Sequence, residues 1–454
     1  MKLKSTMTSP QLQRGLKERH ISLIALGGII GSSYFLGTGY LLKEVGPAAF
    51  IAYALGGLIS YLTLACLAEL AVSSPAQGSF VNSAEKYISP AWACGVGWSY
   101  WFNWVIYIPS ECIAGGIIMQ NFVPGVPIYI WALFFAVIIT FSNIINVKAF
   151  GELEFWLSLI KIALLIGFSV LAALIFFGWI GSLHAPIGTR YLLGDGGLLP
   201  NGLGLLFINM VILMSNFQGS EIIGLTASEA ENPEKAIPAA LNKVTFRIIG
   251  IYVIPTFMLA LILPWRDGGL EQSAFSVALS KYGLNHVAHL FSFLIITGAL
   301  SSANSGVYAT VRTLLALCQK GMGPKALTKI NRNGVPTYAT YATLLAVWSL
   351  LIIACFFISP KLYALLLATS GFTGSICWIS ICWAQLRFRK EAKNLGIKLA
   401  YKVPFFPYLT LFSIIIQVII LFVVLIEPNL RPAFYFGLPV LLLPILWHKK
   451  YRST

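Results

Sequence analysis

Charged residues are scarce in this sequence. Only 10% of the 454 residues are Asp, Glu, Lys or Arg, whereas 57% are hydrophobic and the mean hydropathy is +0.80. A soluble globular domain carries about 25% charged residues. A soluble core of this size could not bury so much apolar surface, so a soluble enzyme or binding domain is excluded. Lipid must be the solvent for much of the chain.

Motifs for ATP hydrolysis and for metal binding are missing as well. The sequence has no GxxxxGKS/T loop, so an ATP-driven pump is not indicated, and it has no HExxH motif or other metal-ligand cluster. The seven cysteines form no CxxC pair and mostly lie in apolar stretches, so they give no disulfide framework. Residues 1–20 are polar and basic, without a cleavable signal peptide. The sequence predicts no cofactor and no metal.

Long apolar stretches make up most of the chain. About 20 apolar residues span a bilayer as a helix, and these stretches do not show the ten-residue alternation of a membrane barrel. No linker long enough to separate domains is present, so residues 1–454 are predicted to form a single all-α membrane domain. We predict twelve spans, at roughly 22–42, 47–72, 92–121, 126–146, 153–179, 200–227, 243–263, 285–316, 337–358, 361–386, 406–427 and 432–448.

Acidic residues are few beside basic ones, with 16 Asp and Glu against 31 Lys and Arg, for a net charge of +15. On a soluble chain this excess would suggest nucleic-acid binding. If the N-terminus is cytoplasmic, however, the inner segments hold roughly four times as many Lys and Arg as the outer ones, which is the positive-inside pattern. We therefore predict both termini in the cytoplasm and no nucleic-acid partner.

The ionisable residues inside the predicted spans include Glu69, Glu111, Lys161 and Glu221. A charge at membrane depth costs a few kcal/mol, so each needs a partner, a path to water or a function. Glu69 lies near the inner end of its span and is predicted to pair with a basic group. The four residues lie on separate spans, which argues against the clustered nucleophile, dyad or metal of a membrane enzyme.

Glycine and serine crowd the start of the first span, in Leu26-Gly27-Gly28-Ile29-Ile30-Gly31-Ser32-Ser33. This composition weakens a helix and favours a break. A break would leave the N–H groups of the following half-helix free at the midplane, where they suit a carboxylate. The alternative is close helix packing through small residues.

The sixth span contains a similar interruption, Asn216-Phe217-Gln218-Gly219-Ser220-Glu221. Two interrupted spans in corresponding positions of two halves indicate the binding site of an inverted-repeat transporter. We expect the half-helix of the first span to hold a substrate carboxylate, and unwound carbonyls of the sixth span to hold the amino group.

These segments also carry a family resemblance. The runs RGLKERH and GGIIGSSYFLGTG near the start, FQGSEIIGLTASEAENPEKAIPAAL in the sixth span, GELEFWLSLIK in the fifth, SSANSGVYATVR in the eighth and GVPTYATYATL after it resemble amino-acid permeases of the amino acid–polyamine–organocation superfamily. The resemblance covers nearly the whole chain. Within the superfamily, the sequence is most similar to lysine-type and S-methylmethionine-type permeases.

The resemblance implies a LeuT-type fold of 5+5 inverted repeats with two additional helices. The repeats would be approximately 22–179 and 200–386, the extra helices approximately 406–448, and the cytoplasmic tail 1–20. It also implies proton-coupled uptake of an amino acid through a bacterial inner membrane, by a monomer or weak oligomer in the lipid bilayer. A neutral amino-acid permease, an exchanger and an amino-acid-sensing receptor of the same fold stay open as alternatives.

The resemblance further implies site residues. Phe217 matches an aromatic that closes over the substrate, although a packed core aromatic is the alternative. Asn304 and Ser305 match a polar cluster on the eighth span, although helix-to-helix hydrogen bonding is the alternative. The substrate-binding set that it implies is Gly27, Gly28, Ile30, Gly31, Ser32, Ser33, Glu111, Phe217, Gln218, Gly219, Ser220, Glu221 and Asn304.

Lys161 matches a lysine of the fifth span that the family is thought to use for proton coupling. Burial favours the neutral form of a lysine, so its proton can be linked to conformation. The alternative is a lysine whose side chain reaches the interface. Lys161 lies nine residues beyond Glu152, about 13 Å along a helix, which is too deep for an easy reach to water.

Glu111 places one carboxylate in the middle of the third span. An anionic group facing the pocket would suit a cationic side chain such as lysine, arginine or a sulfonium. The alternative is a structural or proton-accepting carboxylate. We predict a transporter, not an enzyme, with a cationic or sulfonium substrate as the first hypothesis.

Overall fold

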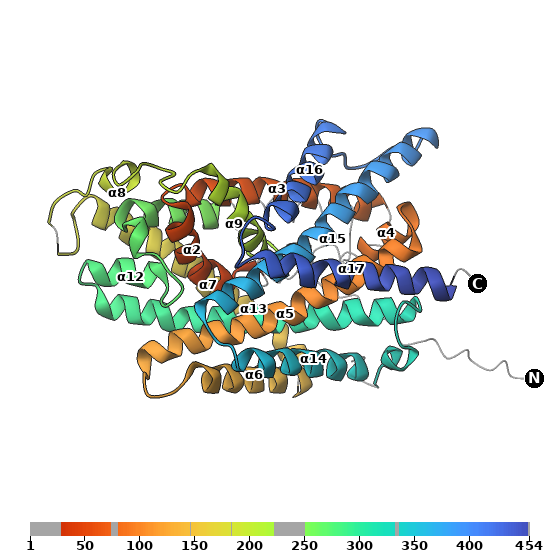
Figure 1. The fold of residues 1–454 in the computed structure, drawn as a ribbon, viewed down its shortest axis with the longest axis horizontal. Coiled ribbons are helices and arrows are strands. Elements are labelled where there is room, and N and C mark those ends of the chain that lie inside the picture. Colours follow the sequence, from red (N-terminus) through yellow and green to blue (C-terminus); the bar gives the residue numbers. More distant parts are fainter. Residues whose placement is uncertain are drawn as a thin grey trace, which may run out of the picture.

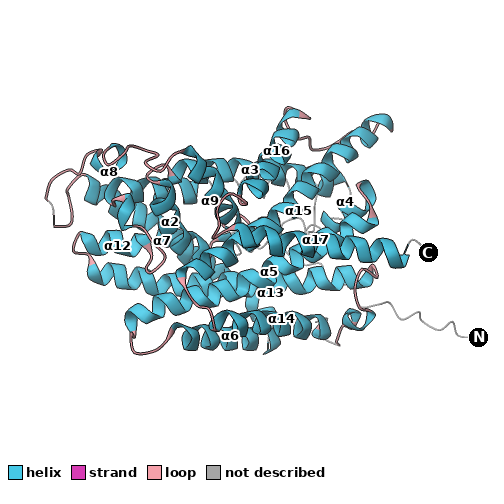
Figure 2. Cartoon of the chain, in the orientation of Figure 1, coloured by secondary structure: helices cyan, strands magenta, loops and turns pink. Residues whose placement is uncertain are grey.

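A computed structural model describes residues 29–73, 80–145, 147–182, 184–221, 250–331 and 336–452. Every regular element in these ranges is helical (Figure 2). The prediction of an all-α membrane protein is confirmed. Six helices in the described part of the chain are long and apolar enough to cross a membrane, and four shorter helices are also apolar.

Helices occupy each of the predicted spans, with shifted ends. The six that meet the length and hydropathy required for a crossing lie in α3 (Ala49–Ser73), α5 (Pro90–Phe122), α7 (Val147–Phe176), α13 (Asn285–Gln319), α14 (Thr337–Cys355) and α15 (Pro360–Asn394). The others are α2 (Ser32–Val45), α6 (Ile128–Ile145), α9 (Leu203–Ser215), the helix Gly250–Ile262, α16 (Tyr408–Val423) and α17 (Arg431–Arg452). Short helices that we did not predict are α4 (Phe80–Tyr87), α8 (Arg190–Leu193) and α12 (Ala274–Lys281).

Local sequence sets the start of two long central helices in the same way. Ser89 precedes Pro90 at the start of α5, and Ser359 precedes Pro360 at the start of α15. Each serine hydroxyl accepts a hydrogen bond at 3.1 Å, from the backbone N–H of Trp92 and of Leu362 respectively. Proline suits the first helical position because its missing N–H would have no partner there.

The helices pack around a centre formed by α5 and α13. These two lie side by side, with α6 and α14 next to them, and α15 crosses α5 (Figure 1). The outer surface is apolar: Phe141 of α6 is 58% exposed and Leu345 of α14 is 70% exposed. A surface of this kind needs lipid as its solvent.

The ionisable residues of the spans lie inside the helix bundle instead. Glu69, Glu111, Lys161 and Glu221 are each at most 1% exposed. This distribution, apolar outside and ionisable inside, is typical of membrane proteins in which the buried charges have a function.

Glu69 makes the ion pair that the sequence predicted. Its carboxylate pairs with Arg389 of α15 and accepts hydrogen bonds from Gln385 Nε2 at 3.1 Å and from the Val403 N–H at 2.7 Å. These contacts tie α3 to α15 and to the segment that precedes α16. All of these partners are structural. None of them belongs to the interrupted spans.

Candidate functional site

The first span is interrupted where the glycine pattern predicted. Ile29 is helical, Ile30 and Gly31 are not, and α2 begins at Ser32. Gly31 is extended, with φ −110° and ψ −172°, and no side chain caps the helix. Ile30, Ser32 and Ser33 are buried. Gly27 and Gly28 lie outside the described residues. The half-helix therefore starts inside the protein, and its Ser32 N–H needs an acceptor from another part of the chain.

The acceptor at this helix end is Glu111. The Ser32 N–H donates to Glu111 Oε2 at 2.9 Å. The positive end of the helix dipole and the free N–H groups favour a carboxylate at this position. Oε1 of Glu111 makes no hydrogen bond of good geometry and is buried. Glu111 thus occupies the place that we predicted for the substrate carboxylate. The position favours the proton-accepting or structural alternative over contact with a substrate side chain.

Three hydroxyl groups from other helices surround the start of α2. Tyr107 OH of α5 lies 3.0 Å from Ser33 Oγ and 3.4 Å from Ser302 Oγ of α13. Tyr363 OH of α15 lies 3.2 Å from Ser32 Oγ. Our sequence analysis missed all three as site residues. Tyr107 and Ser302 lie within stretches that it examined, whereas Tyr363 carries no sequence signal. We call Gly31, Ser32, Tyr107, Glu111 and Ser302 the α2 site.

Helix α9 ends within the predicted sixth span, at the residues that the sequence pattern indicated. Helix α9 ends at Ser215, and residues 216–221 form turns that we call the unwound segment. Gly219 has φ +99°, in a region that glycine enters without steric cost. Ser220 Oγ donates to the Phe217 carbonyl at 2.9 Å, within the segment. Gln218 Nε2 reaches α15, where it lies 3.2 Å from the Gly371 carbonyl.

Glu221 is the last described residue of the unwound segment. Its carboxylate accepts hydrogen bonds from the Gly219 N–H at 3.0 Å, from Tyr100 OH at 2.9 Å and from Trp378 Nε1 at 3.1 Å. The side chain is fully buried. The two side-chain donors come from α5 and α15, so Glu221 ties the unwound segment to both helices.

Tyr252 connects the two interruptions. Its hydroxyl lies 2.9 Å from the carbonyl of Ile29 and 2.9 Å from the carbonyl of Asn216. The hydroxyl has one hydrogen, which it can donate to either carbonyl or share between the two. Phe217 packs against the Tyr252 ring at 5.2 Å between centroids and is 0% exposed. The first and sixth spans thus meet in the fold, and Tyr252 is a further residue that the sequence analysis missed.

Lys161 reaches the same region from α7. Its side chain is 1% exposed, and its Cγ lies 3.6 Å from the point that a Cβ on Gly298 of α13 would occupy. It interacts electrostatically with Glu111. The structure therefore brings Lys161, Glu111 and the start of α2 into one cluster. The alternative of a lysine that reaches the membrane interface does not fit this burial.

The side chain of Asn304 makes its hydrogen bonds away from the α2 site. Its side-chain oxygen accepts hydrogen bonds from Ser142 Oγ at 3.0 Å and from Asn143 Nδ2, both on α6. Ser305 is buried next to it in α13. Asn304 therefore joins α13 to α6 in this structure, which matches the alternative of hydrogen bonding between helices.

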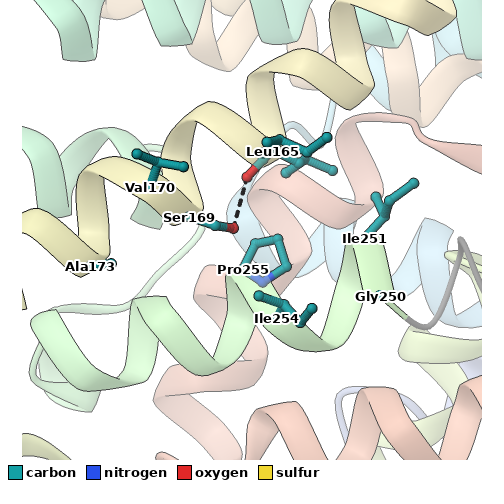
Figure 3. Close-up of a pocket in the computed structure, with 9 residues that line it drawn as sticks. Leu165, Ser169, Val170, Ala173, Gly250, Ile251, Ile254 and Pro255 are labelled. Atoms are coloured by element: carbon teal, nitrogen blue, oxygen red, sulfur yellow. Dashed lines mark hydrogen bonds between the residues drawn. The ribbon is translucent and has the colours of Figure 1, made fainter.

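A cavity of about 480 Å³ lies between α7 and the helix Gly250–Ile262, apart from the α2 site (Figure 3). Its lining is apolar except for Ser169, whose hydroxyl donates to the Leu165 carbonyl at 2.9 Å. Ile166, Val170 and Ile254 in the lining are more than half exposed. The cavity is a groove on the lipid-facing surface, and the α2 site itself is closed around buried side chains.

Comparison with known proteins gives consistent matches. The family model described as amino acid permease matches residues 20–454. The chain is 37% identical over 446 residues to the amino-acid permease RocE of Bacillus subtilis, covering 96% of this chain and 95% of the relative. It is 35% identical to the lysine-specific permease LysP of Lactococcus lactis, over 92% of this chain and 84% of the relative. It is also 35% identical to the aromatic amino acid transport protein AroP of Salmonella typhimurium, over 92% and 91% respectively.

Proposed function

The chain belongs to the amino acid permease family, and from this premise we propose that it is a secondary active transporter that takes up a cationic or sulfonium amino acid together with protons. It is a multi-pass membrane transporter and not an enzyme. The observation that carries the proposal is the meeting of two interrupted membrane helices at a helix N-terminus that already binds a carboxylate. A site of this kind suits the carboxylate of an amino acid.

Membership of the family implies a LeuT-like fold. We propose the finer arrangement of twelve spans, with inverted repeats at approximately 22–179 and 200–386 and two extra helices at approximately 406–448. Both termini would lie in the cytoplasm, and the membrane would be the bacterial cytoplasmic membrane. The two interruptions, five spans apart, support the repeat because such carriers bind their substrate where corresponding helices of the two halves break.

The proposed binding mode uses backbone groups on both interruptions. The substrate carboxylate would dock on N–H groups in the stretch from Gly27 to Ser33, and the α-ammonium would meet carbonyls of the unwound segment. Phe217 would close over the substrate in alternating access. The side-chain contacts of Asn304 with α6 make it the weakest member of the proposed set.

The substrate class rests on the resemblance to lysine-type permeases and on a relative named lysine-specific. A neutral amino-acid permease is the second candidate, because another relative of equal identity is named for aromatic amino acids. A competition panel separates the two. Purified protein in proteoliposomes with an inward proton gradient would take up labelled lysine in the presence of each other amino acid or S-methylmethionine.

Competition by cationic compounds alone, with loss of accumulation when a protonophore is added, would support the proposal. Competition by neutral amino acids would change the proposed substrate class to neutral amino acids. The assignment as a transporter would stand. Without any uptake, amino-acid binding by the purified protein would favour a sensing role.

Lys161 is the residue that we propose for proton coupling. Lys161→Ala should reduce the ratio of the uptake rates at pH 5.5 and pH 7.5, because a group that links protons to conformation is gone. Lys43→Ala serves as the control, since Lys43 is an exposed lysine near the end of α2. Uptake by the Lys161→Ala variant that still rises at low pH as in the unchanged protein would refute the assignment.

A further inference from the structure

We propose that, without substrate, Glu111 occupies the position of the substrate carboxylate at the start of α2. When substrate binds, its carboxylate displaces the Glu111 side chain, and Glu111 takes up a proton. The inference rests on the proposed function, because it needs an amino acid at this helix end. It gives Glu111 a role in binding different from contact with the substrate side chain.

The Ser32 N–H has room for one carboxylate. The Ser32 N–H is taken by Glu111 Oε2 at 2.9 Å, and the Gly31 and Tyr34 N–H groups already bond the carbonyls of Ile29 and Gly31. A Cβ on Gly31 would lie 2.5 Å from Glu111 Oε1, so the carboxylate also fills the space in front of the helix. A substrate carboxylate therefore reaches the Ser32 donor only when Glu111 leaves.

Glu111 has fewer hydrogen bonds of good geometry than Glu221. Only Oε2 has a well-formed hydrogen bond, while Oε1 is buried without one. Glu221, by contrast, has hydrogen bonds on both oxygens. A buried carboxylate with one oxygen unsatisfied is the easier of the two to displace or to protonate.

Repulsion between two neighbouring carboxylates then favours a proton on Glu111. Among the described residues, the titratable groups that interact with Glu111 are Tyr107 and Cys112 of α5, Tyr252, Tyr363 of α15 and Lys161 of α7. Lys161 is the single cation of this set and offsets one carboxylate at most. When the substrate adds a second carboxylate, and its ammonium lies at the unwound segment, a proton on Glu111 removes the repulsion between the two.

The sign of the pH dependence follows from linkage. If substrate binding is accompanied by uptake of one proton, binding must become tighter as the pH falls. The limit for one linked proton is about tenfold in affinity for each pH unit.

The test measures equilibrium binding in detergent, without a gradient. The probe is an equimolar mixture of the protein amino acids except histidine, and the apparent affinity comes from the rise in the thermal unfolding midpoint as the probe is titrated at pH 5.5 and pH 7.5. We expect the unchanged protein to bind up to about 100-fold more weakly at pH 7.5. Glu111→Gln should bind equally at both pH values. Glu391→Gln, an exposed glutamate near the end of α15, should behave as the unchanged protein.

Two outcomes of the variant would overturn the proposal: a Glu111→Gln protein that keeps the original pH dependence, or one that is folded and no longer binds at either pH. A second measurement needs no variant. Adding the probe to unchanged protein in weak buffer near pH 7 should draw about one proton per bound amino acid from solution, and no proton uptake would overturn the exchange. Failure of both the probe and S-methylmethionine to stabilise the unchanged protein at either pH would contradict the proposed function itself.

Discussion

Alanine at Gly31 is expected to abolish uptake, whereas alanine at Gly37, in the same helix, should leave it nearly intact. A Cβ on Gly31 would lie 2.3 Å from Tyr107 OH, 2.5 Å from Glu111 Oε1 and 2.9 Å from Ser302 Oγ. Real Cβ atoms do not come so close to their neighbours, so the three side chains must move. At Gly37 the nearest atom is Leu367 Cδ1 at 3.8 Å, an ordinary contact.

The backbone at Gly31 does not itself forbid alanine, since its φ is −110°. The expected loss comes from displaced groups at the α2 site and not from strain in the chain. Overpacking of this kind costs about 1–3 kcal/mol of stability. A misplacement of about 1 Å at a reacting or binding centre can cost about 100-fold in rate.

Uptake into proteoliposomes, with the thermal unfolding midpoint measured beside it, checks this prediction. We expect Gly31→Ala to lose about 100-fold in initial rate and to remain folded, and Gly37→Ala to stay within a few fold of the unchanged protein. Near-normal uptake by Gly31→Ala would mean that the crowding around Gly31 is not the arrangement in which substrate is bound.

Hydropathy and composition were enough to predict the membrane class and the positions of the helices. They could not predict every end, because a helix can continue past the bilayer when its sequence allows it. Helix α15 runs to Asn394, well beyond the predicted 386, through the polar run RFRKEAKN. The short helices α4 and α12 were missed because eight residues are too few to span a bilayer.

The interruptions of the first and sixth spans were predictable because glycine and polar residues in an apolar span weaken the helix locally. Their partners were not. Tyr252, Ser302 and Tyr363 lie far from α2 in the sequence and reach it only through helix packing. A carboxylate in mid-span, such as Glu111, carries no local signal of which helix end it will face.

The sequence analysis placed Glu111, Glu221 and Asn304 in one substrate-binding set. The helix packing gives these residues different partners. Glu111 and Lys161 come together near α2, while Asn304 bonds to α6 and Glu221 to donors on α5 and α15. Position within a membrane span could not distinguish the roles of these residues, because each lies in an apolar span. Their roles depend on which face of each helix turns inward.

Tyr252→Phe is the second change from which we expect a large loss. The Tyr252 hydroxyl lies 2.9 Å from the carbonyls of both Ile29 and Asn216, and these two residues are at most 1% exposed. Phenylalanine keeps the ring and its packing on Phe217, so the variant removes the bridge alone. Buried carbonyls without their donor cost about 1–3 kcal/mol, which corresponds to about a tenfold to a hundredfold loss of the bridged arrangement.

The matched control is Tyr282→Phe. The Tyr282 hydroxyl also donates to a buried backbone carbonyl, that of Ile262 at 2.6 Å, but away from the two interruptions. Both variants should lose a similar amount of thermal stability, since each loses one hydroxyl donor. Only Tyr252→Phe should lose uptake by about tenfold or more, because only there does the lost hydrogen bond join the first and sixth spans. Equal uptake by the two variants would mean that the bridge contributes to stability alone, and that the two interrupted helices do not need to be held together for transport.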